Sequence, residues 1–349
     1  MLELKSKEWK EFRLLDLFDY KRGNQNNMNS LLQGNDMLIS AKNSNNGLKG
    51  FFSSNNVNKG LYKGNCITLN NDGDGGVGLA YYQPHKFLLD SHVYALYPKI
   101  PMSKYTMIYI TQVLSKQRVC FSHGYSISQD RLKTMRLMLP LDDQGNPDYT
   151  FMDEYIRERE AMLLQKYKKF IDNNCQNGGG IQPLQNKEWK EFFLTNIFTD
   201  IQRGKRLKKE DHIQGNIPYI SSSALSNGVD NFVSNQEKVR IFSNCITLAN
   251  SGSVGSCYYQ PFAFVASDHV TRLSNPIFNQ YHYLFLATLI SRFSEKYNFN
   301  REINDLRISR EKIMLPVDKK GSPDYFYMEQ YGKLLMARKY QQYLDYLEA

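Results

Sequence analysis

The hexapeptide Lys-Glu-Trp-Lys-Glu-Phe occupies residues 7–12 and recurs unchanged at residues 187–192. Six further motifs follow it in the same order in both halves of the chain, at offsets of 176 to 181 residues. Constant order with small drift in spacing indicates one ancestral unit that was duplicated and whose loops then changed in length. The further pairs are Arg22-Gly23 with Arg203-Gly204, Asn65–Leu69 with Asn244–Leu248, Tyr81–Pro84 with Tyr258–Pro261, His92-Val93 with His269-Val270, Met138–Pro140 with Met314–Pro316, and Pro147–Tyr149 with Pro323–Tyr325.

Each copy is long enough to fold as a domain with its own core. Three consecutive glycines and a proline, without any periodicity, lie in the stretch 173–183 and predict a linker between the copies. The predicted organisation is a first globular domain at 1–148, its long helix at 149–176, a linker at 177–186, a second globular domain at 187–325 and its long helix at 326–349.

Most of each globular domain is expected to be strands and turns. Short β-branched or aromatic runs alternate with clusters of Gly, Asn, Asp and Pro. A helical pattern then precedes a polar stretch and an apolar run that ends in Met-Leu-Pro. The predicted fold class is therefore α+β with a β-rich core. In the first copy the strand runs are 66–69, 80–82 and 92–97; the helical patterns are 104–119 and 280–297; the polar stretches are 126–136 and 301–312.

Each copy closes with a turn and a long helix, expected at about 149–174 and 326–348. Apolar side chains recur three or four residues apart along one face of each helix. Such a face can dock on its own domain, or the two helices can bury each other. We expect the second arrangement, an antiparallel pair with pseudo-twofold symmetry. The side chains expected between the helices are Ile156, Leu163, Tyr167, Phe170, Met336, Tyr340, Tyr343 and Leu347.

Composition restricts the class of protein. A net charge of +9 and a pI of about 9.1 favour an anionic partner. No stretch approaches 18 consecutive apolar residues, and the first residues lack the apolar segment of a signal peptide, so no membrane association is expected. The five cysteines are odd in number and widely spaced, without a C-x-x-C motif. This pattern predicts reduced thiols in a cytoplasmic protein without a structural zinc site.

No catalytic or metal-binding constellation emerges from the sequence. Asn146–Tyr149 (Asn-Pro-Asp-Tyr) is one residue away from the Asn-Pro-Pro-Tyr motif of N6-adenine methylation, but its twin begins with Ser322. Both precede a predicted helix, which favours a turn and helix cap. Gly73–Gly78 lacks the G-K-[ST] of a phosphate loop and leads into a strand, which predicts a β-turn. The repeat-matched His92 and His269 are expected at structural or DNA-facing strand positions, because a contiguous Asp-Ser-His is not a triad.

Nucleic acid is the anionic partner that the loops favour. Base recognition requires polar side chains on loops, with cations nearby for phosphates. Framework motifs agree between the copies whereas loop residues differ, so two copies would read two different sequences. The candidate DNA-binding residues are Lys21, Arg22, Lys42, Asn43, Ser44, Tyr125, Ser126, Ser128 and Arg131 in the first copy and Arg203, Lys205, Arg206, Lys208, Ser222, Ser223, Arg301 and Arg307 in the second.

The ordered, duplicated set of motifs resembles the specificity subunit of type I and type IIB restriction–modification systems over essentially the whole chain. The compact length is closer to the type IIB kind. The resemblance implies two target-recognition domains that read a bipartite, asymmetric site in double-stranded DNA, and helices that act as a spacer and bind a methyltransferase subunit or a fused restriction–methylation subunit. It implies no catalysis in this chain, with S-adenosylmethionine bound by the partner.

Two other classes of protein compete with this interpretation. One is a stand-alone DNA-modifying enzyme with duplicated domains, which would require a catalytic motif. The other is a carbohydrate- or protein-binding adhesin, against which the basic charge and the reduced cysteines argue. The helices add a geometric prediction. About 24 helical residues rise about 36 Å, roughly one turn of DNA, so the two half-sites are expected to lie about a turn apart.

Overall fold

The computed structural model describes residues 2–26, 30–56, 60–73, 76–121, 124–175 and 181–348. The chain divides into two units, Met1–Gln165 (unit 1) and Lys166–Ala349 (unit 2). The division lies within the long helix α4 (Tyr149–Cys175), whose last residues pack in unit 2. Residue 176 of the predicted first helix and residues 177–180 of the predicted linker lie outside the described residues, and the predicted domain boundaries stay predictions.

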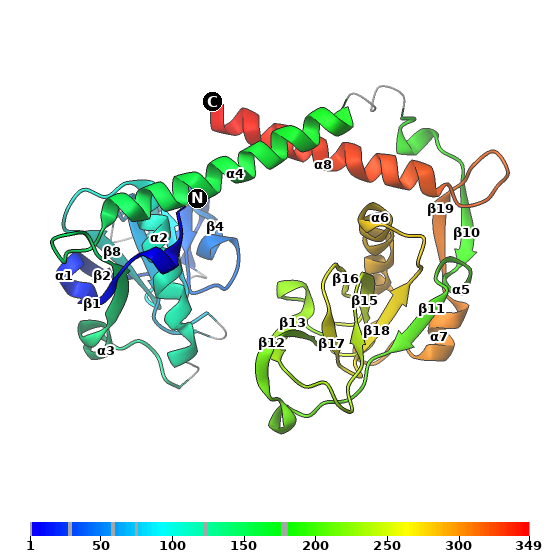
Figure 1. Cartoon of the computed structure of the whole chain (residues 1–349), viewed down its shortest axis with the longest axis horizontal. Helices are drawn as coiled ribbons and strands as arrows, with labels where there is room; N and C mark the ends of the chain where they lie inside the picture. The colour runs from blue at the N-terminus through cyan, green and yellow to red at the C-terminus, as the bar shows by residue number, and fades with distance from the viewer. Residues whose placement is uncertain are drawn as a thin grey trace. The chain divides into compact units, whose positions relative to one another are not determined.

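Unit 1 contains two β-sheets of three or more strands, a separate strand pair formed by β1 and β9, and a helix, α2, that covers the larger sheet (Figure 1). The larger sheet has the strand order β2-β8-β5-β6 and is antiparallel throughout. The smaller sheet has the order β4-β3-β7, in which β3 and β7 run parallel. The elements are η1 Leu4–Ser6, β1 Trp9–Arg13, α1 Leu14–Leu17, β2 Phe18–Arg22, β3 Gln33–Ile39, η3 Asn45–Gly47, β4 Leu48–Phe52, η4 Ser54–Asn56, β5 Cys66–Asn70, β6 Ala80–Gln83, β7 Phe87–Leu89, β8 Val93–Pro98, α2 Lys104–Lys116, η5 Gln117–Cys120, α3 Gln129–Thr134, β9 Arg136–Pro140 and α4.

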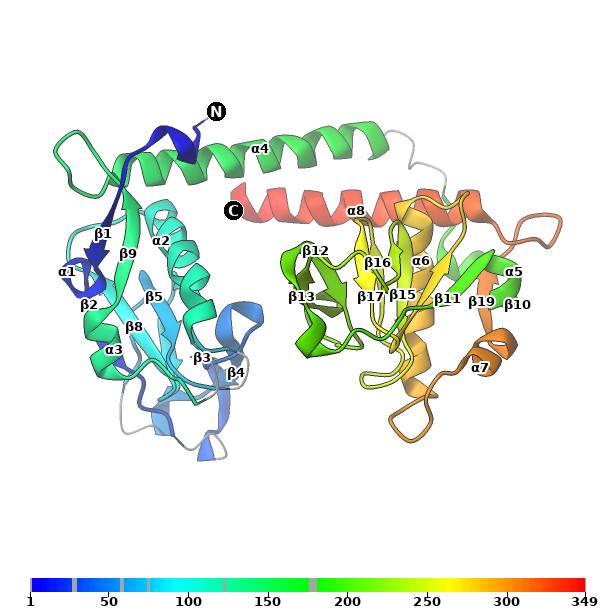
Figure 2. The same ribbon diagram turned by 60° about the horizontal axis from the view of Figure 1, so that its bottom comes forward.

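Unit 2 repeats this topology, with β11-β18-β15-β16 in one sheet and β13-β12-β17-β14 in the other. Helix α6 contacts both β16 and α8, as Figure 2 shows. The elements are η6 Leu184–Asn186, β10 Trp189–Phe193, α5 Leu194–Ile197, β11 Asp200–Arg203, η7 Lys209–Asp211, β12 Gln214–Ile220, η8 Ser226–Gly228, β13 Val229–Val233, β14 Ile241–Phe242, β15 Cys245–Ala249, β16 Cys257–Gln260, β17 Phe264–Ala266, β18 Val270–Ser274, α6 Gln280–Ile290, η9 Ser291–Glu295, α7 Asp305–Arg310, β19 Lys312–Pro316 and α8 Tyr325–Glu348.

The predicted α+β class with two β-rich domains and two long helices is confirmed. The helical patterns end earlier than predicted, since α2 and α6 each give way to a short 3₁₀ helix. The polar stretches contain helices that were not predicted, α3 and α7. Each begins at a side chain that accepts a hydrogen bond from a backbone N–H of the first turn, Ser128 in α3 and Asn304 in α7.

The repeated hexapeptide closes each unit in the same way. It forms β1 and β10, which pair antiparallel with β9 and β19, the strands that lead to the long helices. The indole N–H of Trp9 donates to the carbonyl of Leu4 (3.1 Å), and Trp189 makes the same bond to Leu184 (3.2 Å). Identical contacts in both copies explain why this segment kept its sequence.

The first lysine of the hexapeptide also fixes the start of each long helix. Lys7 pairs with Asp148 and Lys187 with Asp324, each at 2.7 Å. Asp148 accepts a hydrogen bond from the N–H of Phe151 (2.8 Å), and Asp324 accepts the corresponding bond in α8 (2.9 Å). The predicted turn and cap at the Pro-Asp-Tyr motifs is thereby confirmed.

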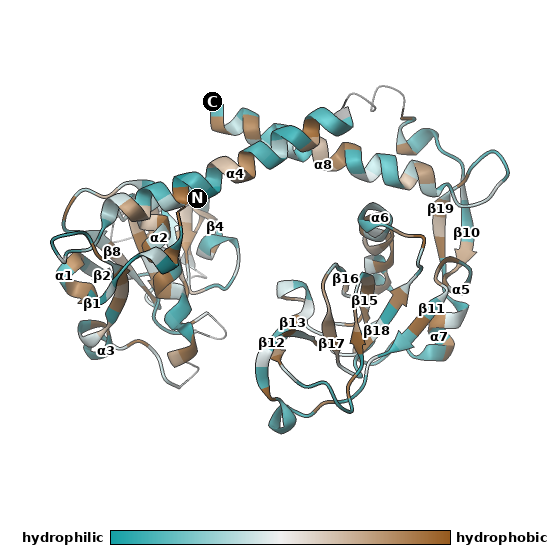
Figure 3. Ribbon diagram, viewed as in Figure 1, coloured by the Kyte–Doolittle hydropathy of each residue, from teal (hydrophilic) through white to brown (hydrophobic). Residues whose placement is uncertain are grey.

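The end of α4 packs antiparallel against α8 within unit 2. Tyr167 stacks on Tyr340 with ring centroids 4.2 Å apart and meets Tyr343 edge-on at 6.0 Å. Phe170, one turn further along α4, meets Tyr340 at 5.3 Å. Figure 3 shows the apolar and polar bands that alternate along α8. This part of the predicted helix pair is confirmed.

Of the other four predicted pairing residues, Ile156 lies elsewhere, and the pairing of the other three stays a prediction. Ile156 packs against the core of unit 1, because it follows the buried Met152 by one turn. Leu163 and Leu347 keep 44% and 40% of their surface exposed, and Met336 lines a groove of unit 2. Within the described residues, no helix has the length and apolar character needed to cross a membrane.

Candidate nucleic-acid interface

The topology gathers the predicted DNA-contacting loops at one edge of each unit. In unit 1, β2 and β5 end at this edge and β8 begins there, because β8 lies antiparallel between them. The parallel strands β3 and β7 end at Ile39 and Leu89, where Asp90 N–H donates to the carbonyl of Ile39. We call the segments at this edge, together with the segment around the start of α3 or α7 that hydrogen-bonds to them, the loop edge. It comprises residues 22–26, 40–46, 71–73, 90–92 and 125–131 in unit 1 and 203–208, 221–227, 250–252, 267–269 and 301–307 in unit 2.

Backbone hydrogen bonds tie the loop edge of unit 1 together. The N–H of Asn71 donates to the carbonyl of His92 (2.9 Å), and the N–H of Ile127 donates to the carbonyl of Asn71 (2.7 Å). The guanidinium of Arg22 donates from Nε to the carbonyl of Ser91 (2.9 Å). Residues far apart in the chain, such as Arg22 and the segment around Ser126, are thus brought together.

The loop edge of unit 2 uses the same bonds at the matching residues. Asn250 N–H donates to His269 (3.0 Å), and Ile303 N–H donates to Asn250 (2.9 Å). Gly204 lies so close to the carbonyl oxygen of Ser267 that a side chain would clash with it, since a Cβ at this position would be 2.1 Å away. The Arg-Gly motif therefore allows β11 to approach the strand connection closely.

In unit 1 some of the predicted DNA-binding side chains have hydrogen-bond partners within the unit, and others are exposed to solvent. The ammonium of Lys42 donates to the carbonyl of Leu48 (3.2 Å), whereas Asn43 and Ser44 are exposed. Lys21 lies 5.7 Å above the ring of Tyr97 and lines a different pocket from Lys42.

Arg131 and Arg307 have the same structural contact in both units. Each guanidinium donates to the carbonyl five residues earlier, at Ser126 and Glu302 respectively. Arg131 also lies 3.7 Å over the ring of Tyr125, which is half exposed. These arginines shape the loops that begin α3 and α7, and Ser128 caps α3.

Three of the predicted cations of unit 2 lie on the segment after β11. Lys205 and Arg206 are exposed, and Lys208 pairs with Glu210 at 3.6 Å. Arg203 pairs with Asp305 at 3.3 Å, and Arg301 lies over the ring of Tyr297. The carbonyl of Ser222 accepts a bond from Ser253 N–H, and the Ser223 hydroxyl accepts from Leu225 N–H.

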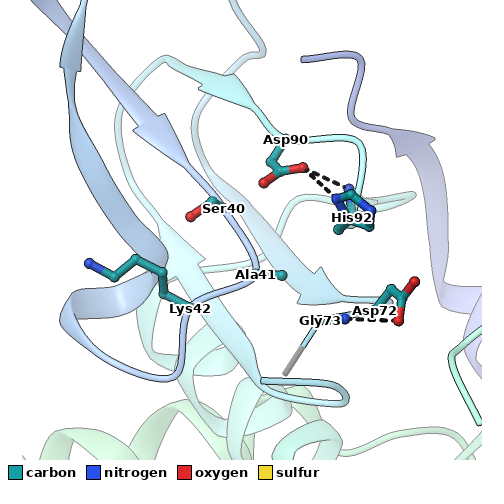
Figure 4. A pocket seen from close by; sticks show the side chains of 7 residues that line it. All are labelled: Ser40, Ala41, Lys42, Asp72, Gly73, Asp90 and His92. Carbon is teal, nitrogen blue, oxygen red and sulfur yellow. Dashed lines mark hydrogen bonds and ion pairs between the residues drawn. The ribbon is translucent and has the colours of Figure 1, made fainter. Parts of the chain in front are cut away.

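A pocket of about 330 Å³ in the loop edge of unit 1 contains residues that were not predicted as site residues (Figure 4). Asp72, Asp90 and His92 line it together with Ser40 and Lys42. The matching positions of unit 2 are Ser251, Ser267, His269, Ser221 and Ser223. The repeated His-Val motif marked His92 in the sequence, but it did not indicate the pocket that surrounds this residue.

The repeat-matched thiols of Cys66 and Cys245 are buried, which suppresses their reactivity. Burial raises the pKa of Cys66 to about 12, and it does the same for Cys245 at the matching position. Among the described residues, no group of three or more His, Cys, Asp and Glu side chains could hold a metal ion. The thiols of these two strands belong to the core, as expected from their position in the repeated Asn-Cys-Ile-Thr-Leu run.

Comparison with known proteins agrees with the duplication. The family model described as "Type I restriction modification DNA specificity domain" matches residues 6–169 and again 186–343. A protein of Heyndrickxia coagulans described as "Type II restriction enzyme BgcI specificity subunit S.BcgI" is 29% identical over 331 residues, which cover 93% of each chain.

Two solved structures are also similar to the chain. The type I restriction–modification S subunit of M. genitalium is 16% identical, with a TM-score of 0.40 over 99% of this chain and 94% of that one. The HsdS subunit of Thermoanaerobacter tengcongensis is 11% identical, with a TM-score of 0.33 over 97% and 90%. On the strength of the two family matches, the chain belongs to the specificity subunits of restriction–modification systems, which are recognition subunits without catalytic activity of their own, and it carries the specificity domain in two copies.

Proposed function

We propose that the chain reads a bipartite, asymmetric site in double-stranded DNA, with one half read by the loop edge of each unit. One observation carries this proposal. The two loop edges have the same backbone bonds but different exposed side chains, for instance Asn43 against Ala224 and Ser44 against Leu225. A common scaffold with different donors and acceptors is what two different half-sites require.

Cations beside these loops support contacts to phosphates. Lys205, Arg206 and Lys208 follow directly after β11, where Lys205 N–H donates to the carbonyl of Ala266 at the start of the 267–269 loop. Phosphate contacts position the duplex, and base contacts from the neighbouring loops then provide sequence specificity. In unit 1, Asn24 and Gln25 occupy the places of Lys205 and Arg206, and the nearest predicted cations are Lys21 and Arg22.

The long helices support the role of a spacer. Helix α4 has 27 residues and α8 has 24. At 1.5 Å per residue they are about 40 and 36 Å long, close to one turn of DNA. We propose that the part of α4 after Ile156 pairs with α8 with pseudo-twofold symmetry, and that the helices hold the half-sites about a turn apart.

A methyltransferase subunit, or a fused restriction–methylation subunit, is the proposed protein partner, and it would bind the S-adenosylmethionine. Matching apolar grooves of about 600 Å³ support a partner that meets both units in the same way. One is lined by Trp9, Tyr109 and Tyr155, and the other by Trp189, Phe285 and Tyr331. The complex would act on DNA in the cytoplasm. Similarity to a specificity subunit of a type II enzyme supports a type IIB-like assembly.

Two measurements test the proposal. Methylation mapping in a host that expresses the chain with the neighbouring methyltransferase gene should show a two-part motif with a gap, and a single continuous motif would contradict it. DNA binding should also weaken with salt. Replacing Lys205, Arg206 and Lys208 with Ala should reduce the slope of log K against log salt by up to about 2.7, at roughly 0.9 per phosphate contact. Replacing the exposed Lys319 and Lys320 of the turn before α8 with Ala provides a control that should leave the slope unchanged.

A further inference from the structure

His92 lines the pocket in the loop edge of unit 1, with Asp90 above it and Asp72 below it in Figure 4. Half of its side-chain surface (51%) is exposed, whereas only 12% of the Asp90 side chain is. The Lys42 ammonium points away from the imidazole, toward the carbonyl of Leu48. The exposed part of the ring therefore faces solvent beside acidic neighbours.

Hydrogen bonds hold both the backbone and the imidazole ring of His92 in place. One oxygen of Asp90 accepts the backbone N–H of His92 and also contacts its ring Nδ1, each at 3.0 Å. The carbonyl of His92 accepts the N–H of Asn71. A carboxylate can only accept, so Nδ1 must carry a hydrogen in this pair, and in the neutral ring Nε2 is left as an acceptor.

The matching histidine of unit 2 has neutral partners. His269 contacts the hydroxyl of Ser251 through ring Nδ1, and its backbone N–H donates to the hydroxyl of Ser267 (3.2 Å). A hydroxyl can donate or accept, so this pair does not fix which ring nitrogen carries the hydrogen. The two units thus place a histidine at the same position, but its ring Nδ1 contacts a carboxylate in unit 1 and a hydroxyl in unit 2.

We propose that His92 is a specificity-determining residue of unit 1, which accepts a hydrogen bond at Nε2 from the exocyclic amino group of adenine or cytosine, and that Asp90 is the positioning residue that makes Nε2 an acceptor. This inference rests on the proposed function. In the major groove, only adenine N6 and cytosine N4 present donors. Asp72, a second acceptor in the same pocket, disfavours the guanine and thymine acceptors.

The test uses the complex of the full chain with its methyltransferase partner and a library of duplexes randomised over both half-sites. The unaltered complex should select an adenine or cytosine at one position that His92→Ala no longer selects. The preference there should fall about ten-fold, which corresponds to roughly 1.4 kcal/mol. His85→Ala replaces an exposed histidine between β6 and β7 and should leave every preference unchanged.

Modified bases identify the group that is read. Purine without the 6-amino group, or pyrimidinone without the 4-amino group, should weaken binding of the unaltered complex about ten-fold, a loss of roughly 1.4 kcal/mol. The same base should cost the His92→Ala complex nothing, because the contact is already absent. Asp90→Ser copies the neutral partner of unit 2 and should broaden the preference at the same position, while the half-site of unit 2 stays intact and reports correct folding.

The outcomes separate the two proposals. If the unaltered complex selects no sequence at all, the proposed function fails. If it selects a two-part site but His92→Ala keeps the full preference, the assignment of His92 fails and the proposed function stands. Selection of guanine or thymine at the position that depends on His92, or an equal loss of affinity for both complexes on removal of the amino group, would likewise overturn the assignment.

Discussion

Leu139 and Met138 are neighbours in β9, yet their side chains lie in opposite surroundings. Leu139 has no exposed surface and belongs to the core of unit 1, whereas Met138 is 48% exposed. The same alternation occurs in β19, where Leu315 is fully buried and Met314 is 45% exposed. The Met-Leu-Pro motif is thus a structural signature of the strand that closes each unit against the hexapeptide.

This contrast gives a prediction for single residues. Leu139→Ala should lower the free energy of unfolding by about 2–5 kcal/mol, because it removes buried surface and leaves a cavity. Met138→Ala, in the same strand, should change it by less than about 0.5 kcal/mol. Urea denaturation of the full chain provides the measurement. Equal effects of the two substitutions would show that β9 does not pack as described.

Among single residues, contacts within a short segment could be predicted from the sequence, whereas contacts between distant segments could not. The cap at Asp148 was predictable, because a Pro-Asp pair before an apolar stripe is a local signal. The role of Ser126 as acceptor for Arg131 is local too, but it depends on the conformation of the loop. The pocket around His92 joins residues from three distant segments, and no pattern in one sequence reveals such a meeting. Ile156 was misplaced because an apolar stripe does not state which surface covers it.

At the scale of elements, α4 depends on an acidic cap. Burial alone would raise the pKa of the Asp148 carboxyl, but the Lys7 ammonium and the N–H groups of Phe151 and Thr150 outweigh it, so the pKa lies below its usual range. The folded state therefore favours the carboxylate. Its contribution to stability is present above the ordinary Asp pKa of about 3.9 and is lost as the pH falls through the lowered value.

Asp148→Ala should accordingly reduce the free energy of unfolding at pH 7 by about 0.5–2 kcal/mol, the usual value of an N-cap. The difference from the unaltered chain should shrink as the pH falls below about 4 and through the lowered pKa of Asp148, because protonation removes the charge that the variant lacks at every pH. Asp143→Ala, in the exposed part of the same turn, is the control and should have little effect at either pH. Denaturation curves at pH 7 and pH 3 decide the matter, and a constant difference across this range would contradict the cap.

The contact between the end of α4 and α8 is aromatic. Tyr167 and Tyr340 stack at 4.2 Å, so a double-mutant cycle with Tyr167→Ala and Tyr340→Ala should give a coupling energy of about 0.5–1.5 kcal/mol. Tyr346, which is 72% exposed, supplies the control. Tyr346→Ala combined with Tyr167→Ala should be additive. If the effects of Tyr167→Ala and Tyr340→Ala on the free energy of unfolding are additive, this contact does not contribute to the packing of α8.

At the scale of the whole molecule, duplication explains why the two units share their framework and differ in the side chains of their loops. The hexapeptide, the capped helix starts and the backbone bonds of the loop edge agree, because every copy needs them to fold. The family could be predicted from this ordered agreement. The bases that the chain reads could not be predicted from the sequence. They depend on side chains that differ between the copies, and which of these side chains meet at the surface is known only once the chain has folded.

The spacer role leads to a prediction that involves the complete chain. Insertion of seven residues after Gln165 adds about two turns to α4, or roughly 10.5 Å, and nearly preserves the phase of the helix. At about 3.4 Å per base pair, the gap between the half-sites should widen by about three base pairs. Both half-sequences should stay the same, since no residue of either loop edge is changed.

Methylation mapping of a host that expresses the lengthened chain with its partner measures the gap directly. A seven-residue insertion after Gly145, in the exposed turn before α4, is the matched control, because it lengthens the chain without lengthening the helix. Only the insertion in α4 should move the half-sites apart. If both insertions leave the gap unchanged, its length is set by the partner rather than by the helices, and the spacer role is refuted.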